Sequence, residues 1–188
     1  MKTELYIKNM VCPRCIAAVE NLLNSNRLPV DTVELGKAVV NCNLSEMQLQ
    51  QLGKELQLLG FELLDDRKKR ICEQIKNAVV EFVHYQKGSS NLNLSDYIAD
   101  RLHCDYSALS KIFSETENTT IEKYLIAQKT EKVKELLSYG ELNLNQIADR
   151  LNYSSAAYLS SQFKAVTGMT PSQYKNSPHN KRLPLDSI

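Results

Sequence analysis

The chain has 188 residues, which is enough for one large domain or two small ones. Its 23 Lys and Arg balance 22 Asp and Glu to a net charge of +1, so a strongly basic or acidic protein is excluded. No apolar run approaches the roughly 20 residues of a membrane span. Polar residues also interrupt the N-terminus where a signal peptide needs an apolar core, so we expect a cytoplasmic protein without membrane contact. Five cysteines in such a chain argue against a disulfide framework.

Residues 1–66 have the pattern of a small α+β domain. Alternating β-formers predict strands, and Ser45 with Gln48 forms a capping box that opens a leucine-lined helix. The order of elements is βαββαβ, which predicts a ferredoxin-like fold. The expected strands cover residues 4–8, 32–35, 37–42 and 61–64, with helices after the first and third strands.

The first strand-to-helix turn contains Met10-Val11-Cys12-Pro13-Arg14-Cys15. With the 36–40 hairpin and Gly60-Phe61, this motif resembles the heavy-metal-associated domain over nearly all of residues 1–66. In that family two cysteines bind a soft ion, most often Cu(I). The resemblance therefore implies that Cys12 and Cys15 are ligands and that Met10 packs beneath the loop. Asn9 replaces the usual glycine of that family, and because Asn tolerates left-handed backbone we expect the fold to survive.

The chemistry of this cysteine pair agrees with a soft metal. Thiolates near a helix N-terminus have lowered pKa values and prefer soft ions. The histidines all lie outside residues 1–66, so a four-ligand zinc site would need Cys42, a carboxylate or a second chain, whereas two-coordinate Cu(I) needs none of these.

Two other interpretations of the cysteine pair remain open. One is a thioredoxin-like site, for which this domain is short and its strand order is wrong. The other is a degenerate metal domain that serves only homodimerisation or contact with the second domain. The remaining cysteines occur singly and are interpreted as structural, namely Cys42, Cys72 and Cys104.

The junction at residues 65–70 has no strand signal and marks a domain boundary. Residues 1–66 hold 6 Lys and Arg against 9 Asp and Glu, a net of −3, whereas the rest holds 17 against 13, a net of +4. This mild basic excess suits nucleic acid without establishing it. An apolar face then predicts a helix to about Lys87, broken at 88–91.

Residues 93–176 contain an internal repeat. Residues 98–102 and 147–151 both read Ile-Ala-Asp-Arg-Leu, and Leu-Ser, Phe and Tyr recur after each. Each copy predicts a helix-turn-helix whose second helix is the candidate for a DNA major groove. These recognition helices are expected over about 106–116 and 155–167, and Asn118 and Gly168 are suited to end them in left-handed backbone.

A single amphipathic helix is predicted between the two copies, over 121–139. About 20 residues at 1.5 Å each give a rod of about 30 Å. Because successive faces of the major groove are about 34 Å apart, one chain can present two recognition helices to adjacent grooves.

Residues 71–176 resemble the AraC/XylS family of transcription regulators, most closely in the second copy. The run that carries the resemblance is Leu144-x-x-Ile147-Ala148 to Tyr158-Leu159-Ser160-x-x-Phe163-Lys164-x-x-Thr167-Gly168-Met169-Thr170-Pro171-x-x-Tyr174. The resemblance implies a double helix-turn-helix domain that binds double-stranded DNA, C-terminal to a sensor or dimerisation module. Residues 67–176 would form this all-α domain and 177–188 a flexible tail, where Lys181-Arg182 add loose phosphate attraction.

Core and groove-facing positions separate by helical spacing. The expected core residues are Ala99, Leu102, Leu109, Ile112, Phe113, Ala148, Leu151, Leu159 and Phe163. The expected DNA-facing residues are Tyr106, Ser107, Ser110, Lys111, Ser155, Ala156, Ser160, Ser161 and Lys164, with the helix starts at Thr120 and Thr170 offered to phosphates. The family often has Arg where Ser161 stands, so we expect the second unit to read sequence weakly.

These features favour a sequence-specific DNA-binding transcription regulator whose N-terminal domain reports a soft metal, a thiol state or a partner. The alternative is a Cu(I) carrier or thiol-redox protein with the helical domain as an adaptor. No paired carboxylates, Ser-His-Asp set or phosphate-binding glycine loop indicates an enzyme.

Overall fold

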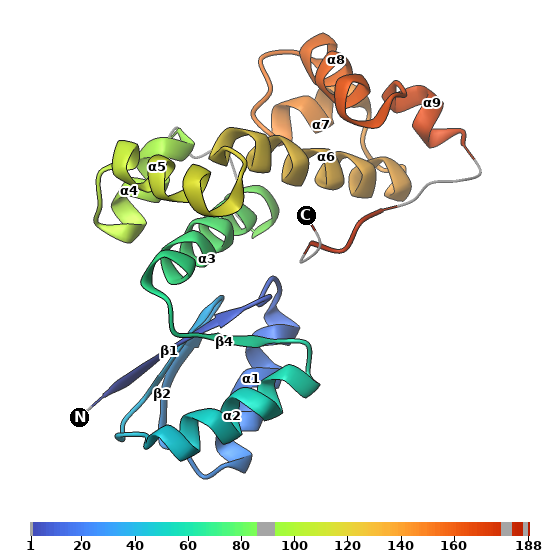
Figure 1. The fold of residues 1–188 in the computed structure, drawn as a ribbon. Helices are drawn as coiled ribbons and strands as arrows, with labels where there is room; N and C mark the ends of the chain where they lie inside the picture. Colours follow the sequence, from blue (N-terminus) through green and yellow to red (C-terminus); the bar gives the residue numbers. More distant parts are fainter. Residues whose placement is uncertain (1, 86–92, 178–181, 186–187) are drawn as a thin grey trace.

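The computed structural model of the chain describes residues 2–85, 93–177, 182–185 and 188. An antiparallel sheet with two helices forms the N-terminal part, and a helical C-terminal domain follows it (Figure 1). None of the helices in the described ranges has the length and apolar character that crossing a bilayer requires.

The N-terminal part has the predicted order of elements. These are β1 (Thr3–Lys8), α1 (Pro13–Ser25), β2 (Val30–Glu34), β3 (Lys37–Val40), α2 (Glu46–Leu58) and β4 (Glu62–Leu64). The strands lie in the order β2-β3-β1-β4, and every neighbouring pair is antiparallel. The buried side chains of β1, Leu5 and Ile7, belong to the same core as Val19 of α1 and Leu56 of α2. Since side chains alternate along a strand, Tyr6 faces the other way, where the Arg70 guanidinium lies 5.2 Å from its ring centroid.

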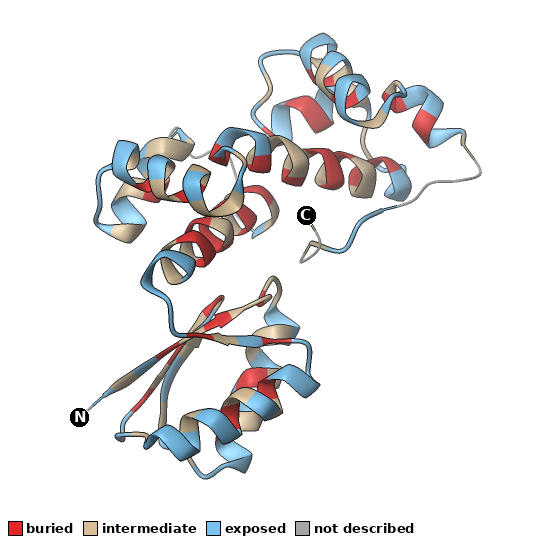
Figure 2. Cartoon of the chain, viewed as in Figure 1, coloured by how far each residue is buried: buried red, intermediate tan, exposed pale blue. Residues whose placement is uncertain are grey.

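The helical domain has two hydrophobic cores joined by one long helix. Its elements are α3 (Arg67–Val80), the π-helical turn η1 (Glu81–Tyr85), α4 (Leu94–Leu102), α5 (Tyr106–Glu117), α6 (Ile121–Tyr139), α7 (Leu144–Arg150), α8 (Ala156–Thr167) and α9 (Pro171–Lys175). The first core gathers α3, α4, α5 and the start of α6. The second gathers the end of α6 with α7, α8 and α9. Figure 2 shows buried residues along α6 and an exposed outer side on α8.

The helices predicted over 106–116, 121–139 and 155–167 agree with α5, α6 and α8 to within one residue at each end. Asn93 and Asn143 cap α4 and α7 by accepting hydrogen bonds from Asp96 N and Gln146 N. Asn118 and Gly168 end α5 and α8 in left-handed backbone, with φ of 53° and 78°. The predicted helix break at 88–91 lies outside the described residues, and the helix expected to reach Lys87 is described only to Tyr85, with η1 as its last turn.

The predicted core positions divide into two groups. Buried are Leu109, Phe113, Ala148, Leu151, Leu159 and Phe163. The other three residues predicted to lie in the core are only partly buried, namely Ala99, Leu102 and Ile112. The first unit is the less deeply packed of the two at these positions, since all three lie in α4 or α5.

The segment predicted as a flexible tail touches α6 at the residues that are described. Arg182 forms an ion pair with Glu135 at 2.9 Å, and Leu183 N donates to Glu131. Arg182 is therefore engaged by protein in this structure, and Lys181 lies outside the described residues. The flexibility of the tail stays a prediction.

Candidate nucleic-acid interface and dithiol loop

The first helix-turn-helix unit consists of α4, a short turn and α5. Asp105 caps α5 by accepting from the backbone N–H groups of Ser107 and Ala108. The Ser107 hydroxyl also donates to this carboxylate, and this hydrogen bond, followed by those from the backbone, lowers the pKa of the Asp105 carboxyl. Leu109 and Phe113 turn into the core, so the opposite side of α5 is left to solvent. That side includes Ser107 near the N-terminus of the helix and Lys111 one turn further on.

The second unit repeats this arrangement at the other end of α6. Ser155 caps α8 by accepting from Tyr158 N, while Leu159 and Phe163 anchor the helix in the second core. Ser161 and Lys164 are exposed on the opposite side. Both units therefore offer the N-terminal half of their second helix to solvent, as a major-groove reader requires.

The predicted DNA-facing residues differ in exposure. Exposed are Ser107, Lys111, Thr120, Ser155, Ser161 and Lys164, whereas Tyr106, Ser110, Ala156, Ser160 and Thr170 are half-buried. The ring of Tyr106 packs against the first core, and burial raises the pKa of its hydroxyl. Thr120 and Thr170 use their hydroxyls as helix caps, accepting from Lys123 N and Gln173 N. Contact of these residues with DNA stays a prediction.

One exposed side chain of α8 was missed by the sequence reasoning. Tyr158 is 54% exposed in the first turn of α8, and its ring centroid lies 6.0 Å from that of Tyr153. Lys129 of α6 places its Nζ 4.7 Å from the Tyr153 centroid. Tyr158 lies in the run that carries the family resemblance, and it was given no role from the sequence. Its position directly before the core residue Leu159 is the signal that could have placed it at the surface of the helix.

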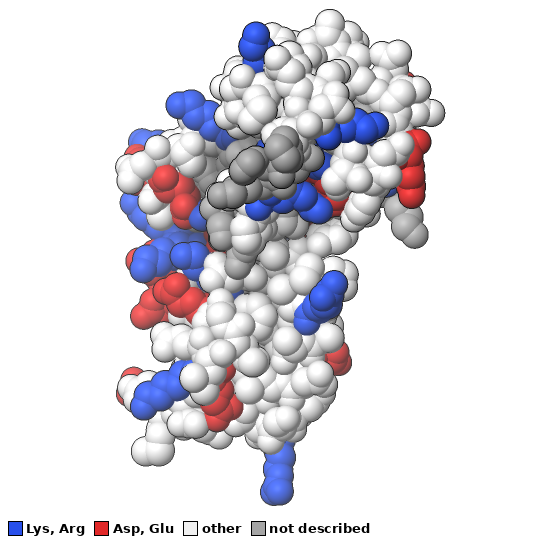
Figure 3. All heavy atoms as spheres, turned by 90° about the vertical axis from the view of Figure 1, so that its right-hand side faces the viewer, with Lys and Arg blue, Asp and Glu red and all other residues white. Residues whose placement is uncertain are grey.

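The charge on the molecular surface is mixed. On the side that Figure 3 shows, Lys and Arg are scattered among uncharged and acidic residues and form no large patch. This distribution agrees with the net charge of only +1. On this side, attraction to phosphates would therefore come from individual Lys and Arg side chains and not from a broad basic face.

The predicted cysteine ligands lie together at the start of α1. Their Sγ atoms are 3.3 Å apart, and the Met10 side chain is fully buried in the N-terminal core, as predicted. Burial acts to raise the pKa of the Cys12 thiol, but hydrogen bonds from the Cys15 thiol and from backbone N–H groups outweigh it and lower that pKa. Burial raises the pKa of the Cys15 thiol. Of the two thiols, that of Cys12 is therefore the first to lose its proton as pH rises.

The donor set at this loop fits a two-coordinate soft ion better than zinc. Within the described ranges, no group of three or more His, Cys, Asp and Glu side chains is placed to hold a metal. Two thiols alone suit Cu(I), which accepts soft sulfur ligands, whereas structural zinc takes four ligands. Cys42 and Cys72 are half-buried and buried, but Cys104 is exposed between α4 and α5, so the structural role predicted for it does not fit.

The cysteine loop is hydrogen-bonded to the helical domain on both sides of Met10. Asn9, in left-handed backbone with φ 72°, donates its N–H to the buried Glu73 carboxylate of α3 at 3.1 Å. The Tyr85 hydroxyl of η1 donates to Val11 O at 2.8 Å. Desolvation raises the pKa of Glu73. The loop is therefore a contact surface between the two parts of the chain as well as a dithiol site.

The β2–β3 turn makes a second contact with α3. Gly36 has φ 77°, and a Cβ there would lie 1.9 Å from the Asn77 side-chain Nδ2. That Nδ2 is buried and makes no hydrogen bond to the described residues. Glycine is needed here for its backbone conformation and for the close approach of α3.

Comparison with known proteins finds similarity in the helical domain. Residues 98–177 match the family model of a helix-turn-helix domain. The chain is 31% identical over 132 residues to the Msm operon regulatory protein of Streptococcus mutans, a match that covers 70% of this chain and 45% of that protein. It is 31% identical over 100 residues to the xylose operon regulatory protein of Escherichia coli, covering 53% of this chain and 26% of that protein.

A solved structure with a related helical arrangement is the C-terminal domain of AraT, a response regulator from Geobacillus stearothermophilus. It is 24% identical with a TM-score of 0.49, and the match covers 63% of this chain and 92% of that one. The chain spans less than half the length of the two curated relatives above. The similarity to the helix-turn-helix family model begins at Ile98 of α4 and includes both units.

Proposed function

We propose that this protein is a sequence-specific DNA-binding transcription regulator of the AraC/XylS type, with double-stranded DNA as its partner. The observation that carries the proposal is the pair of helix-turn-helix units held at the two ends of one continuous helix, α6. Both units leave the outer side of their second helix free of protein among the described residues.

The length of α6 supports simultaneous binding by both units. Its 19 residues give about 28 Å at 1.5 Å per residue, close to the spacing of about 34 Å between successive major-groove faces. Both cores include side chains of α6, so the helix holds the two units at a fixed distance and angle. The relatives named above, two of them operon regulatory proteins, support the same conclusion.

Selection from a random pool of duplex DNA tests this proposal. We expect enrichment of one sequence, with two protected segments about one helical turn apart in a footprint. Affinity for that duplex should fall steeply as salt rises. Salt-insensitive or absent duplex binding would instead favour the alternative, a soft-metal carrier or thiol-redox protein with a helical adaptor.

We infer that the N-terminal part is a ferredoxin-like domain of the heavy-metal-associated type, which reports a soft metal to the DNA-binding domain. The βαββαβ order, the antiparallel sheet and the paired thiols over a buried Met10 support this inference. Cys12 and Cys15 would hold the ion as thiolate ligands, and occupancy of this site would be the signal that the domain reports.

The route from this loop to the first recognition helix runs through α3. Glu73 of α3 accepts from the loop, and one turn further Lys76 forms an ion pair with Glu117 of α5 at 2.7 Å. Cys72 of α3 places its thiol 3.9 Å from Ile112 O of α5. A movement of the loop that shifts α3 would therefore reach α5 directly.

Replacement of both cysteines by serine tests metal reporting separately from DNA binding. We expect the wild-type chain to bind Cu(I) under reducing conditions and to change its affinity for the selected duplex when loaded. The Cys12→Ser/Cys15→Ser chain should bind the duplex with one affinity regardless of Cu(I). Identical curves for the wild type with and without Cu(I) would refute sensing and leave DNA binding intact. Homodimerisation through this domain stays a prediction, which sedimentation of the full chain would test.

A further inference from the structure

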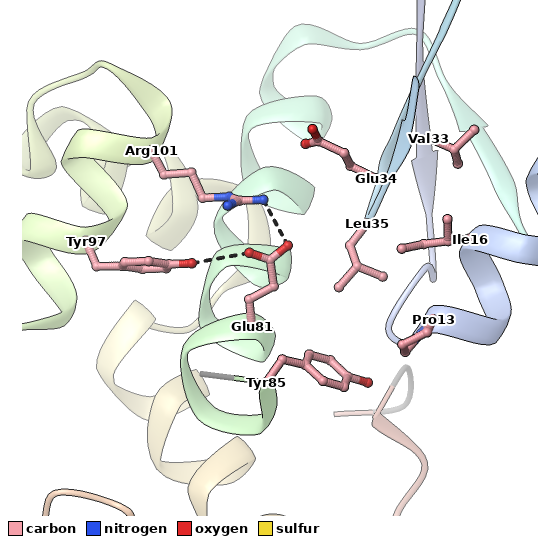
Figure 4. Close-up of a pocket in the computed structure, with 9 residues that line it drawn as sticks. All are labelled: Pro13, Ile16, Val33, Glu34, Leu35, Glu81, Tyr85, Tyr97 and Arg101. Atoms are coloured by element: carbon pink, nitrogen blue, oxygen red, sulfur yellow. Dashed lines mark hydrogen bonds and ion pairs between the residues drawn. The ribbon is translucent and has the colours of Figure 1, made fainter. Parts of the chain in front are cut away.

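A pocket of about 480 Å³ lies between the N-terminal part and the helical domain (Figure 4). One wall is apolar and comes from α1, β2 and the turn after β2, through Pro13, Ile16, Val33 and Leu35. The opposite wall comes from η1 and α4. Its size falls within the range of small-molecule sites, which occur preferentially between domains.

The wall formed by η1 and α4 contains a carboxylate that is already satisfied. Glu81 accepts from the Arg101 guanidinium at 2.8 Å through one oxygen and from the Tyr97 hydroxyl at 3.2 Å through the other. Figure 4 shows these three side chains pointing toward one another on the side of the pocket opposite Ile16 and Val33. Arg101 is therefore neutralised, and it does not make the pocket a site for anions.

A second carboxylate at the pocket has no such partner. Glu34, at the end of β2, lines the pocket and forms neither an ion pair nor a hydrogen bond within the described part of the chain. The nearby cation that acts on it, Lys37, lies outside the lining and forms its ion pair with Glu4 at 2.7 Å. With Glu81 and Arg101 cancelling, Glu34 leaves the pocket with a net charge of −1. The carboxylate and the apolar wall together favour a ligand that carries one positive charge on an apolar body.

Two tyrosine rings strengthen this assignment. Tyr97 and Tyr85 both line the pocket, and Tyr85 is 40% exposed, so part of its ring is open to a ligand. Aromatic faces attract organic cations, and quaternary and methylated ammonium groups are recognised by such rings. We propose that the pocket binds a small organic ammonium compound with an aromatic or aliphatic body and that this ligand regulates DNA binding.

The regulatory part of the proposal rests on the proposed function and follows from the elements that line the pocket. α4 is the first helix of the first helix-turn-helix unit, and Tyr85 also holds Val11 O beside the cysteine loop. A ligand in contact with both walls binds only the arrangement in which the two parts meet, so it stabilises that arrangement and fixes α4 within it.

The binding test uses the full chain and three probes of similar shape: 2-phenylethylammonium, 2-phenylethanol and 3-phenylpropanoate. We expect the ammonium probe to bind with a dissociation constant of about 1 mM, a value ordinary for so small a compound, and the others at least about tenfold more weakly. Amide shifts in two-dimensional NMR should map to α4, η1 and the end of β2. Shifts elsewhere or none, or equal binding of the alcohol, would overturn the assignment.

Matched variants identify the charge that selects the ligand. Glu34→Gln keeps the shape of the side chain and should weaken binding of the ammonium probe about tenfold. Glu46→Gln removes an exposed carboxylate of α2, away from the pocket, and should leave binding unchanged. Equal affinity in the wild type and the Glu34→Gln chain would contradict the role assigned to Glu34.

The regulatory role is tested by measuring the affinity for the selected DNA duplex with and without the ammonium probe. We expect saturation with the ammonium probe to change duplex affinity about fivefold or more, a typical allosteric coupling, and Glu34→Gln to abolish this change at the same probe concentration. Ammonium binding that leaves duplex affinity unchanged would overturn the regulatory role. A chain that binds no duplex at all would refute the proposed function, while the NMR experiment still decides whether the pocket is an ammonium site.

Discussion

Insertion of residues into α6 separates the two recognition helices without altering either one. Each added helical residue rotates everything beyond it by about 100° and moves it by about 1.5 Å. Two alanines between Lys129 and Thr130 would therefore turn the second unit by about 200° and shift it by about 3 Å. The insertion point lies between the α6 residues of the first core, which end at Leu125, and those of the second, which begin at Val133.

The expected loss of affinity follows from the linkage of two binding modules. Two units that engage one duplex together bind about 100-fold to 10,000-fold more tightly than one alone. We expect the two-alanine chain to lose at least about 100-fold in affinity for the selected duplex, measured by fluorescence anisotropy at fixed salt. Its footprint should shrink to one protected segment.

A four-alanine insertion at the same place is the matched control. It turns the second unit by about 400°, which leaves a net rotation of about 40°, and lengthens α6 by about 6 Å. This chain should retain more affinity than the two-alanine chain, although it is the longer. Circular dichroism should show intact helices in both, since alanine is the strongest helix former. Wild-type affinity in the two-alanine chain would show that the units do not act together on one duplex.

Three further outcomes are expected. If Lys111 and Lys164 contact phosphates, Lys111→Ala and Lys164→Ala should each reduce the slope of log affinity against log salt concentration by about 0.9. An unchanged slope would show that the replaced lysine does not contact a phosphate. Burial lowers the pKa of His84 to about 4, below its value of about 6.5 when unfolded, so the unfolded chain takes up a proton first as pH falls. Stability should consequently drop by up to about 3 kcal/mol between pH 6.5 and pH 4 in urea unfolding, and a His84→Gln chain should lack this drop. Gly36→Ala should lower the melting temperature more than Gly60→Ala does. Both glycines have positive φ, but only Gly36 packs against a side-chain amide of α3. Equal losses of melting temperature would mean that this contact contributes nothing to stability.

The elements of this protein are determined largely by local sequence. Capping residues such as Asn93, Asn143 and Thr170 satisfy the first backbone N–H groups of a helix from within a few positions, and Asn118 and Gly168 end a helix by their own tolerance of positive φ. Apolar residues at helical spacing fix which side of α5 and α8 turns inward. The two copies, the helix between them and the cysteine pair were therefore predictable without coordinates.

What depends on distant residues was not predictable. The partial exposure of Ile112 and the exposure of Cys104 are decided by how closely α4 and α5 pack on α3, which local spacing does not specify.

The pocket and the double attachment of the cysteine loop also appear only in three dimensions. Asn9 and Glu73 are 64 positions apart, and Val11 and Tyr85 are 74 apart. Nothing in the pattern around either partner marks the other, because a hydrogen bond between domains requires only that the fold bring one donor to one acceptor. Sequence alone determined the two helix-turn-helix units and the dithiol, and the tertiary structure decided that the dithiol loop contacts α3 and η1.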